Sequence, residues 1–478
     1  MKGLFVRPSY SHVYSRFKLG RACDVVPPLG YLYLASYLEA DGHKIGIIDG
    51  EMERLDQHQI VNQVLALNPD FVGIGATTPE FTDSSYILHK IKELSPHIIT
   101  ITGGPHPSAR PEETLRENPH IDYVVRYEGE QTTLELLDTL DDNGDVSRIK
   151  GLTYRKEGDV ISNEDRDPIP DIDALPFPAR HLIDNKRYLH PIFGKRGLAP
   201  VTAMITSRGC PYRCIFCYRS KEQSKTRFRS PSNIVDEIEE VVNRYNIKFI
   251  SFHDDTLTLP RKRVLKMCDE IVERGIDIQW FCLVRVDTLD RELLIAMKKA
   301  GLVSLSIGVE SGNQKILDSV KKETRLEQYR VAFKLLTDLE IETRGSFMIG
   351  LPHETPRTIR NTINFAKSLD LNKAFFNITT PYPGSVLYDK AIMGDGIHLL
   401  TRDWKEYQRW GNAVIELEGV NRQELIKWQK RAMLEFYLRP RIIWSHLKYF
   451  IGAGHDPLYY KPQPFKWMLS VFNIRGDK

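Results

Sequence analysis

Three of the six cysteines crowd into residues 210–217, and thiols at such short spacing are typical of a metal site. Cys210, Cys214 and Cys217 are spaced as Cys-x3-Cys-x2-Cys, and the other cysteines are scattered along the chain. A structural zinc ion needs a fourth protein ligand at short spacing, and no histidine or cysteine follows before His253. We therefore expect a 4Fe-4S cluster with one iron open to an exogenous ligand, with zinc or buried free thiols as the alternatives.

The cysteines follow the first of six apolar runs, and the spacing of the runs predicts parallel strands joined by helices. Each interval holds enough residues for one crossover helix, which favours a partial barrel with functional residues at the strand ends. The predicted strands are Thr202–Ser207, Lys248–Phe252, Gln279–Val284, Ser304–Val309, Arg344–Ile349 and Ala374–Thr380.

A second alternating region precedes the cysteines and predicts a parallel sheet with helices on both faces. The predicted strands are Gly3–Arg7, Lys44–Asp49, Phe71–Ala76, Ile98–Thr102 and Tyr123–Arg126. The predicted helices are Gly30–Ala40, Gln57–Leu67, Ser84–Leu94 and Thr132–Leu140. Ligands of such sheets bind beyond the carboxyl ends of the strands, which here are rich in Gly, Pro, Thr and His.

The cysteine spacing after a first barrel strand resembles the radical S-adenosylmethionine (SAM) superfamily. The resemblance implies a cluster whose open iron binds the amino and carboxylate groups of SAM, and cleavage of SAM to a 5′-deoxyadenosyl radical. The residues that the resemblance and the strand ends suggest for SAM are Phe216, Asp254, Asp255, Arg285, Glu310, Ser311 and Ile349. A helix N-cap is the alternative for the two aspartates, and a surface salt bridge is the alternative for Arg285.

No catalytic residue is assigned, because the cofactors carry the radical chemistry. Tyr382 and His353 follow two of the predicted strands and could face the substrate, and packing in the core is the alternative for Tyr382. His353 stands where the family commonly has glycine.

The first region resembles the cobalamin-binding subclass of radical SAM proteins, and the resemblance covers residues 1–390. The expected cobalamin contacts are Pro28, Leu29, Gly30, Thr77, Thr78, Gly103, Gly104, Pro105, His106, Glu128, Gly129 and Glu130. Asp41-Gly42-His43 formally fits an axial-ligand motif, but it lies between a helix and a strand, where Gly42 reads as a helix cap. We expect cobalamin without a protein histidine ligand, and loss of cobalamin binding is the alternative.

The whole chain is thus expected to be α/β, with a Rossmann-like domain, a partial (β/α)6 TIM-type barrel and a helical C-terminal region. The expected boundaries are 1–140 for the cobalamin-binding domain, 141–195 for a hairpin and linker, 196–390 for the barrel and 391–478 for the C-terminal region. Residues 439–478 are basic and aromatic, which suits either a packing helix or a membrane surface.

Composition and hydropathy bear on nucleic-acid binding and on cellular location. A net charge of +3 is too balanced to predict nucleic-acid binding, and no apolar run reaches the length of a membrane span. The N-terminus is too short for a signal peptide, so a cytoplasmic location is expected, with peripheral membrane contact as an option.

The leading hypothesis is methylation of an unactivated carbon through a 5′-deoxyadenosyl radical and methylcobalamin. The alternatives are a radical cyclase or rearrangement enzyme without methyl transfer, and a sensor of cobalamin or metal without turnover. The expected partners are a small-molecule or lipid substrate and an electron donor of the flavodoxin or ferredoxin type.

Overall fold

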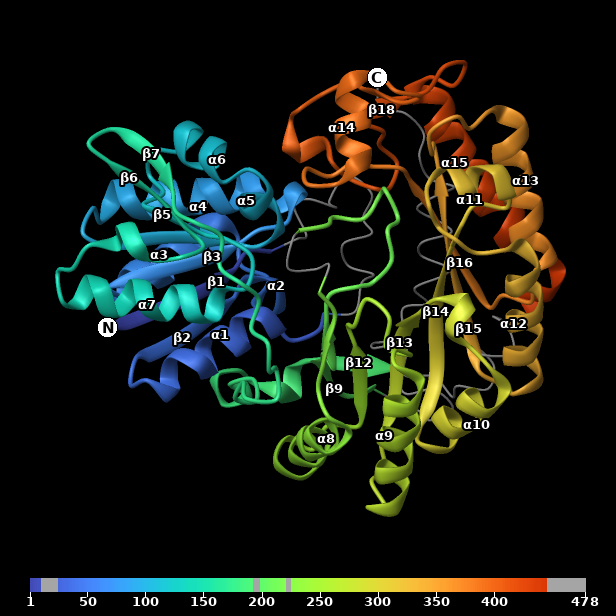
Figure 1. Ribbon diagram of the computed structural model, residues 1–478, viewed down its shortest axis with the longest axis horizontal. Helices are drawn as coiled ribbons and strands as arrows, with labels where there is room; N and C mark the ends of the chain where they lie inside the picture. Colours follow the sequence, from blue (N-terminus) through green and yellow to red (C-terminus); the bar gives the residue numbers. More distant parts are fainter. Residues whose placement is uncertain (10–24, 192–197, 221–224, 445–478) are drawn as a thin grey trace.

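The computed structural model describes residues 1–9, 25–191, 198–220 and 225–444. Within these ranges the chain forms two seven-stranded sheets that lie side by side (Figure 1). Two short pairs of antiparallel strands complete the strands of the described residues. The predicted α/β architecture, a parallel sheet followed by a partial barrel, is confirmed.

The first sheet has the strand order β2-β1-β3-β4-β5-β6-β7. Its strands are β1 (Lys2–Arg7), β2 (Lys44–Asp49), β3 (Phe71–Gly75), β4 (Ile99–Gly103), β5 (Tyr123–Val125), β6 (Leu152–Lys156) and β7 (Asp159–Ser162). Strands β1 to β5 are parallel, and β6 and β7 extend the edge as an antiparallel hairpin. The hairpin expected after residue 140 is therefore part of this sheet.

Helices cover both faces of the first sheet, which explains why its strands read as nearly continuous apolar runs. The helices are α1 (Leu29–Ala40), α2 (Gly50–Glu53), α3 (Gln57–Leu67), α4 (Phe81–Leu94), α5 (Pro105–Ala109), α6 (Pro111–Glu117) and α7 (Gly129–Asp141). Val64 of α3 and Ile87 of α4 belong to the apolar core on one face, and Leu38 of α1 and Leu137 of α7 belong to the core on the other.

The second sheet has the order β16-β15-β14-β13-β12-β9-β8 and is parallel except for β8. Its strands are β8 (Leu189–Pro191), β9 (Leu198–Met204), β12 (Phe249–Phe252), β13 (Gln279–Val284), β14 (Leu302–Glu310), β15 (Glu342–Ile349) and β16 (Lys373–Ile378). The parallel strands follow one another in chain order, so the sheet curls as the predicted partial barrel (Figure 1).

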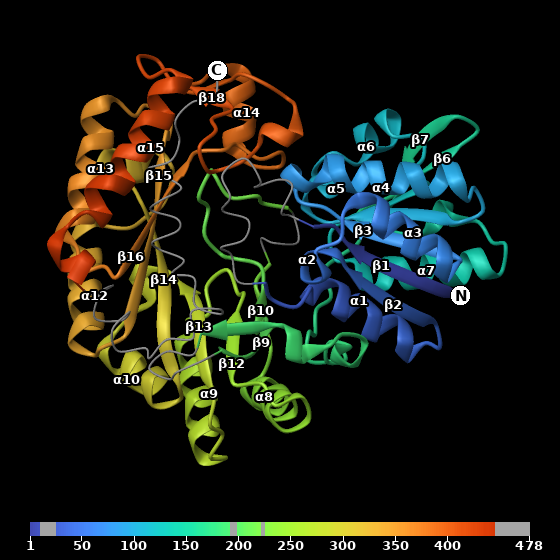
Figure 2. The same cartoon turned by 180° about the vertical axis from the view of Figure 1, so that it is seen from behind.

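Six helices connect the parallel strands and lie on the outer side of the curled sheet (Figure 2). They are α8 (Pro231–Tyr245), α9 (Arg261–Glu273), α10 (Arg291–Lys299), α11 (Gln314–Ser319), α12 (Leu326–Asp338) and α13 (Pro356–Ser368). Helix α8 shows why they form where they do: Ser230 caps the backbone N–H of Asn233, Pro231 opens the first turn, and Asn246 ends the helix in the left-handed conformation.

After the barrel come α14 (Val386–Met393) and α15 (Arg422–Tyr437), and α15 packs against β16 and α13. Between these helices the chain forms loops, the short strands β17 (His398–Leu399) and β18 (Ile415–Glu416), and the 3-10 turn η7 (Trp404–Glu406). Most of the basic aromatic tail lies outside the described residues. Among the described residues, no helix is long and apolar enough to span a bilayer.

Candidate active site

The cysteine loop begins beyond the carboxyl end of β9 and is closed at its base by β10 (Ser207–Arg208) and β11 (Arg227–Phe228). Gly209 adopts a φ of 86°, a left-handed conformation that favours glycine, and turns the chain into the loop. The N–H of Ile215 donates to the carbonyl of Val320 at 3.1 Å, and the N–H of Leu387 donates to the carbonyl of Ile215 at 2.9 Å. These bonds fix the loop against the end of the barrel.

The thiols of this loop are suited to hold an iron–sulfur cluster. Cys214 is buried, Cys210 is partly buried and Cys217 is exposed, and the thiols of Cys214 and Cys217 share a hydrogen bond. That hydrogen bond and the positive charges of Lys322 and Arg285 outweigh the effect of burial and lower the pKa of Cys214. The shared hydrogen bond, with burial, raises the pKa of Cys217, and burial raises that of Cys210. A metal would therefore have to displace protons from these thiols, and the two cations beside the loop favour the negative charge of a bound cluster.

The other described cysteines are structural. Cys268 and Cys282 are buried in the apolar core of the barrel, and burial raises the pKa of both thiols. Cys23 lies outside the described residues. The prediction that Cys268 and Cys282 are not cluster ligands therefore agrees with their burial in the core.

Arg285 ends β13 and faces the cluster loop. Its guanidinium donates to the carboxylate of Asp287 at 3.1 and 3.2 Å and to the carbonyl of Lys322 at 2.7 Å. It also lies 3.6 Å from Sγ of Cys214, and it stacks over the ring of Tyr212. The carboxylate that it pairs with here belongs to the protein, and its expected contact with SAM stays a prediction.

The two aspartates after β12 have different environments. Asp254 is 1% exposed, and its carboxylate accepts hydrogen bonds from the backbone N–H and the hydroxyl of Thr206 and from the hydroxyl of Ser207. Burial raises the pKa of Asp254 despite these bonds. Asp255 is exposed, and its negative charge adds to the effect of burial, which is the main cause of the raised pKa of Cys210. Asp254 therefore positions the start of the cysteine loop, and Asp255 is the aspartate that a ligand can reach.

Glu310 and Ser311 end β14 at an irregularity in the sheet. Glu310 has a φ of 64°, and its carboxylate accepts a hydrogen bond from Nζ of Lys322 at 2.9 Å. The hydroxyl of Ser311 is fully buried and lies 3.2 Å from the hydroxyl of Thr362 on α13. Ser311 therefore joins the end of a strand to a helix, and its expected contact with SAM stays a prediction. Lys322 follows the short helix α11 and not a strand, so a search for polar residues at strand ends does not identify it.

Three other predicted residues lie around the ends of β15 and β16. The side chain of Ile349 is fully buried, so only its backbone could contact a ligand. Tyr382 is partly buried against the core, and its hydroxyl donates to the carbonyl of Tyr407 at 3.4 Å. His353 is exposed beside Gly396, and it does not contact the cysteine loop in any described interaction.

The carboxyl edge of the first sheet carries several glycines. Gly75 and Gly103 are paired in register there, and Gly104 follows with a φ of 87°. A Cβ on Gly104 would lie 3.0 Å from the backbone N of Ala76, so glycine allows the two strand ends to meet. Gly30 opens α1 toward free space, because nothing lies within 4 Å of a Cβ built on it. Such an edge can accept a large ligand against the backbone.

His106 is not available as a ligand. Its ring is 2% exposed and is packed between Phe81 and Trp404, the latter from the C-terminal region. Burial, with a smaller effect of Arg110, lowers the pKa of His106 to about 3, so the imidazole is neutral. An aromatic side chain from distant sequence therefore covers His106, and its expected contact with cobalamin stays a prediction. Thr78 is also buried, with its hydroxyl 3.3 Å from Nδ1 of His106.

His43 lies at the opposite edge of the sheet, just before β2. Its Nε2 lies 3.2 Å from the carboxylate of Asp138, and its Nδ1 lies 3.2 Å from the amino group of Met1. Asp41, His43 and Asp138 place their ligand atoms close together, but this edge is remote from the carboxyl ends of the strands. This position agrees with the interpretation of Asp41-Gly42-His43 as the end of a helix.

Glu128 and Glu130 contact arginines of the barrel rather than open space. Glu130 accepts from Arg208 at 2.6 Å, and Glu128 accepts from Arg227 at 2.6 and 2.9 Å. The expected contacts of these carboxylates with cobalamin stay predictions. Gly129 between them packs against Leu34 of α1.

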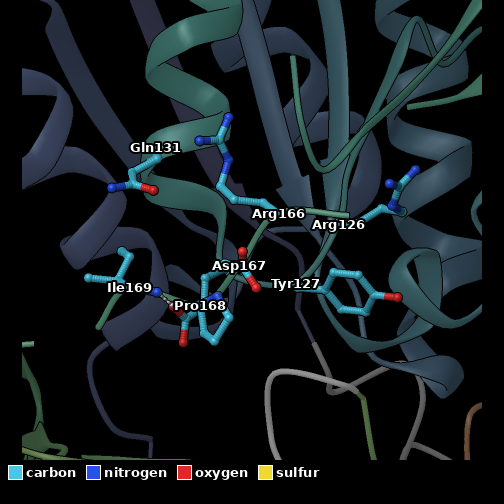
Figure 3. A pocket seen from close by; sticks show the side chains of 8 residues that line it. Arg126, Tyr127, Gln131, Arg166, Asp167, Pro168 and Ile169 are labelled. Atoms are coloured by element: carbon cyan, nitrogen blue, oxygen red, sulfur yellow. Dashed lines mark hydrogen bonds between the residues drawn. The ribbon is translucent and has the colours of Figure 1, made fainter. Parts of the chain in front are cut away.

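A small pocket lies beside this junction (Figure 3). It encloses essentially no space, far less than ordinary ligand pockets, so it is no cofactor site. The pocket is lined by Arg126, Tyr127, Glu128, Gln131, Arg166, Asp167, Pro168 and Ile169.

Comparisons with known proteins identify both halves of the chain. The family model of the radical SAM superfamily matches residues 204–366, and the model of the B12 binding domain matches residues 19–137. An uncharacterized methyltransferase of Pyrococcus horikoshii is 36% identical over 87% of this chain and 89% of its own length. The anaerobic magnesium-protoporphyrin IX monomethyl ester cyclase of Rubrivivax gelatinosus is 31% identical over 96% of this chain and 84% of its own length.

Solved structures share the fold. The radical S-adenosylmethionine methyltransferase TsrM from Kitasatospora setae, with cobalamin and a 4Fe-4S cluster bound, matches with a TM-score of 0.68 and 19% identity, over 85% of this chain and 84% of that one. The cobalamin-dependent S-adenosylmethionine radical enzyme OxsB, with aqua-cobalamin bound, matches with a TM-score of 0.71 and 19% identity, over 100% of this chain and 73% of that one. The three-cysteine loop on a partial barrel and these relatives together show that the chain belongs to the radical SAM superfamily, in the group that carries a B12 binding domain.

Proposed function

We propose that this chain is a cobalamin-dependent radical SAM enzyme that methylates an unactivated carbon of a small molecule. The main support for the proposal is the position of the loop with Cys210, Cys214 and Cys217 between the barrel end and the carboxyl edge of the first sheet. Arg208 at the base of this loop donates a hydrogen bond to Glu130 at the start of α7, which joins the loop to the first domain. A cluster site and a B12 binding domain therefore meet at one place. When bound there, the cofactors supply a carbon-centred radical and a transferable methyl group.

The chain's own residues hold and orient these groups. Cys210, Cys214 and Cys217 bind the cluster, and Arg285 and Lys322 balance its negative charge. For SAM we assign the exposed carboxylate of Asp255 to the amino group, and Glu310, Phe216 and the backbone of Ile349 to the nucleoside.

For cobalamin we assign the glycine-rich carboxyl edge of the first sheet, without a histidine ligand. The buried ring of His106 supports that choice. The residues assigned to this edge are Pro28, Leu29, Gly30, Thr77, Gly103, Gly104 and Pro105.

The relatives favour methyl transfer and also support a second candidate. The Pyrococcus horikoshii protein is named a methyltransferase, whereas the Rubrivivax gelatinosus protein is named a cyclase and matches 96% of this chain. A radical cyclase that transfers no methyl group is therefore the second candidate. For either reaction we propose an electron donor of the flavodoxin or ferredoxin type, and a cytoplasmic location stays a proposal.

An isotope experiment distinguishes the candidates before a substrate is known. Anaerobic protein loaded with the cluster and cobalamin is reduced and supplied with SAM that carries a ¹³C-labelled methyl group. Mass spectrometry of the extracted cobalamin, together with chromatography of the nucleosides, then measures label transfer, S-adenosylhomocysteine and 5′-deoxyadenosine.

Labelled cobalamin together with 5′-deoxyadenosine is the expected result. Formation of 5′-deoxyadenosine without labelled cobalamin would favour the cyclase, and absence of both products would favour a sensor. The Cys210→Ala/Cys214→Ala/Cys217→Ala variant is the control, and it should form no 5′-deoxyadenosine.

A further inference from the structure

The two strands at the base of the cysteine loop place two arginines side by side. Strand β10 leads into the loop and β11 follows it, and Arg208 is paired directly with Arg227 in their antiparallel register. Two guanidinium groups this close repel each other unless carboxylates lie between them. The chain supplies those carboxylates from the other domain.

Glu128 and Glu130, at the start of α7, bind both arginines. Nη2 of Arg208 donates to Glu130 at 2.6 Å, and Nη1 of the same residue lies 3.7 Å from Glu128. Arg227 donates to both carboxylate oxygens of Glu128, at 2.6 and 2.9 Å. The four side chains are 6–17% exposed, so salt screens these ion pairs less than it screens pairs on the surface.

Further contacts extend the junction to α1 and to the linker. Tyr33 of α1 is 5% exposed; the guanidinium of Arg208 lies over its ring, and Arg229 donates to its hydroxyl at 3.5 Å. Arg227 also donates to the carbonyl of Ile169 at 2.7 Å, and the N–H of Ile169 donates to Glu128 at 2.9 Å. The junction therefore contacts two of the helices that begin at the carboxyl edge of the first sheet, α1 and α7.

The charges within the junction balance. Two guanidinium groups face two carboxylates, and the bond from Arg227 and the charge of Arg208 hold the pKa of Glu128 below its ordinary value although burial raises it. The carboxylates of Glu128 and Glu130 are therefore paired with the arginines. Their placement at the base of the cysteine loop suggests a positioning role.

We propose that Arg208, Arg227, Glu128 and Glu130 form a latch that holds the base of the cysteine loop against the B12 binding domain and so fixes the distance between the two bound cofactors. The four are positioning residues, since they act through the loop and through α7. This inference rests on the proposed function only in that both cofactors must bind.

The test measures geometry instead of turnover. Protein loaded with cobalamin and cluster is reduced until both centres are paramagnetic, and the relaxation enhancement of the cob(II)alamin EPR signal by the cluster reports their separation. Hydrogen exchange of the peptide that covers residues 209–217 is measured on the same samples, together with iron and cobalamin content. The variants are Arg208→Gln, Glu130→Gln and the conservative Arg208→Lys.

A matched control comes from α7 itself. Arg166 and Glu135 form an ion pair within the first domain, away from the cysteine loop, so Arg166→Gln removes a similar arginine–glutamate contact. This variant should match wild type in both measurements.

Arg208→Gln and Glu130→Gln are expected to weaken the relaxation enhancement and to speed exchange of the loop peptide roughly tenfold, with cofactor content retained. Arg208→Lys keeps the charge and should restore most of both signals. If Arg208→Gln folds poorly by circular dichroism, Glu130→Gln and Arg227→Gln provide the same comparison.

The latch would be overturned if Glu130→Gln and the arginine variants showed the same relaxation enhancement and hydrogen exchange as wild type. It would also be overturned if Arg208→Lys did not restore the signals that Arg208→Gln loses. These measurements need no methyl transfer. Wild-type protein that shows the relaxation enhancement of the cob(II)alamin signal but forms no labelled cobalamin would therefore contradict the proposed function without contradicting the latch.

Discussion

Nη1 of Arg285 lies 3.6 Å from Sγ of Cys214, with the guanidinium held in place by Asp287 and by the carbonyl of Lys322. Arg285 is 5% exposed, so its charge acts on the thiolate through a medium with little water. A hydrogen bond and a positive charge beside a cluster sulfur both favour the reduced, more negative state of the cluster. We therefore expect Arg285 to raise the reduction potential of a cluster bound by this loop.

Arg285→Gln should lower the midpoint potential of the cluster. A hydrogen bond to a charged group contributes about 1.5–3 kcal/mol, which corresponds to about 60–130 mV for a one-electron couple. EPR-monitored redox titration measures the shift. Arg285→Lys keeps the charge and should shift less, and Arg261→Gln, which breaks a surface pair, should leave the potential unchanged. A potential that stays the same or rises in Arg285→Gln would contradict the role assigned to this residue.

Alanine substitution of any one of Cys210, Cys214 and Cys217 should abolish the stable four-iron cluster. Each removes one of the three protein ligands that the loop supplies, and the buried core thiols cannot replace it. Iron analysis and the absorbance of the anaerobically reconstituted protein measure the loss. Cys268→Ala is the matched control, because that thiol is 1% exposed in the core, and it should retain full iron content. A four-iron spectrum in a loop variant would refute the ligand assignment.

The ion pair of Glu310 and Lys322 is buried, with side chains 10% and 7% exposed. Lys322→Met leaves the Glu310 carboxylate without its partner, which should cost about 3–5 kcal/mol of stability. Urea denaturation followed by tryptophan fluorescence measures the loss. The double variant Lys322→Met/Glu310→Gln should recover most of it, since no uncompensated charge remains. Equal destabilisation of the single and double variants would show that packing, not charge, accounts for the effect.

The strands were predictable because their apolar runs reflect burial along the local chain. Lys44–Asp49 and Gln279–Val284 agree with the sequence prediction residue for residue. The cysteine loop was predictable for a similar reason, since its ligands lie within eight residues of one another. The boundaries of the domains stay predictions.

Side-chain partners across long sequence separations were not predictable. Arg208 and Glu130 are 78 residues apart, and Arg227 and Glu128 are 99 apart, so only the packing of the two domains brings them together. The strand-end rule correctly placed Glu128 and Glu130 at the edge of the sheet, but it could not show that arginines already bind them. Trp404 covers His106 in the same way, from the far end of the chain.

Glu354 stabilises the turn after β15, next to the segment assigned to the nucleoside of SAM. One carboxylate oxygen accepts from the backbone N–H groups of Gly350 and Leu351 at 2.8 and 3.1 Å, and Gly350 has a φ of 94°. The other oxygen is buried and has no hydrogen-bond partner within the described part of the chain. Burial outweighs the two backbone bonds and raises the pKa of Glu354 from 4.5 to about 7.

The raised pKa makes stability depend on pH in a defined direction. Between about pH 4.5 and 7 the folded state keeps the proton of Glu354 and the unfolded state has lost it, so this residue's contribution falls as pH rises, by about 3 kcal/mol. Glu354→Gln mimics the protonated form and should remove this loss. Urea midpoints of wild type and variant at several pH values measure it: the variant should gain relative stability from pH 5 to pH 8. A difference that does not change with pH would mean that Glu354 is ionised in the folded protein throughout that range.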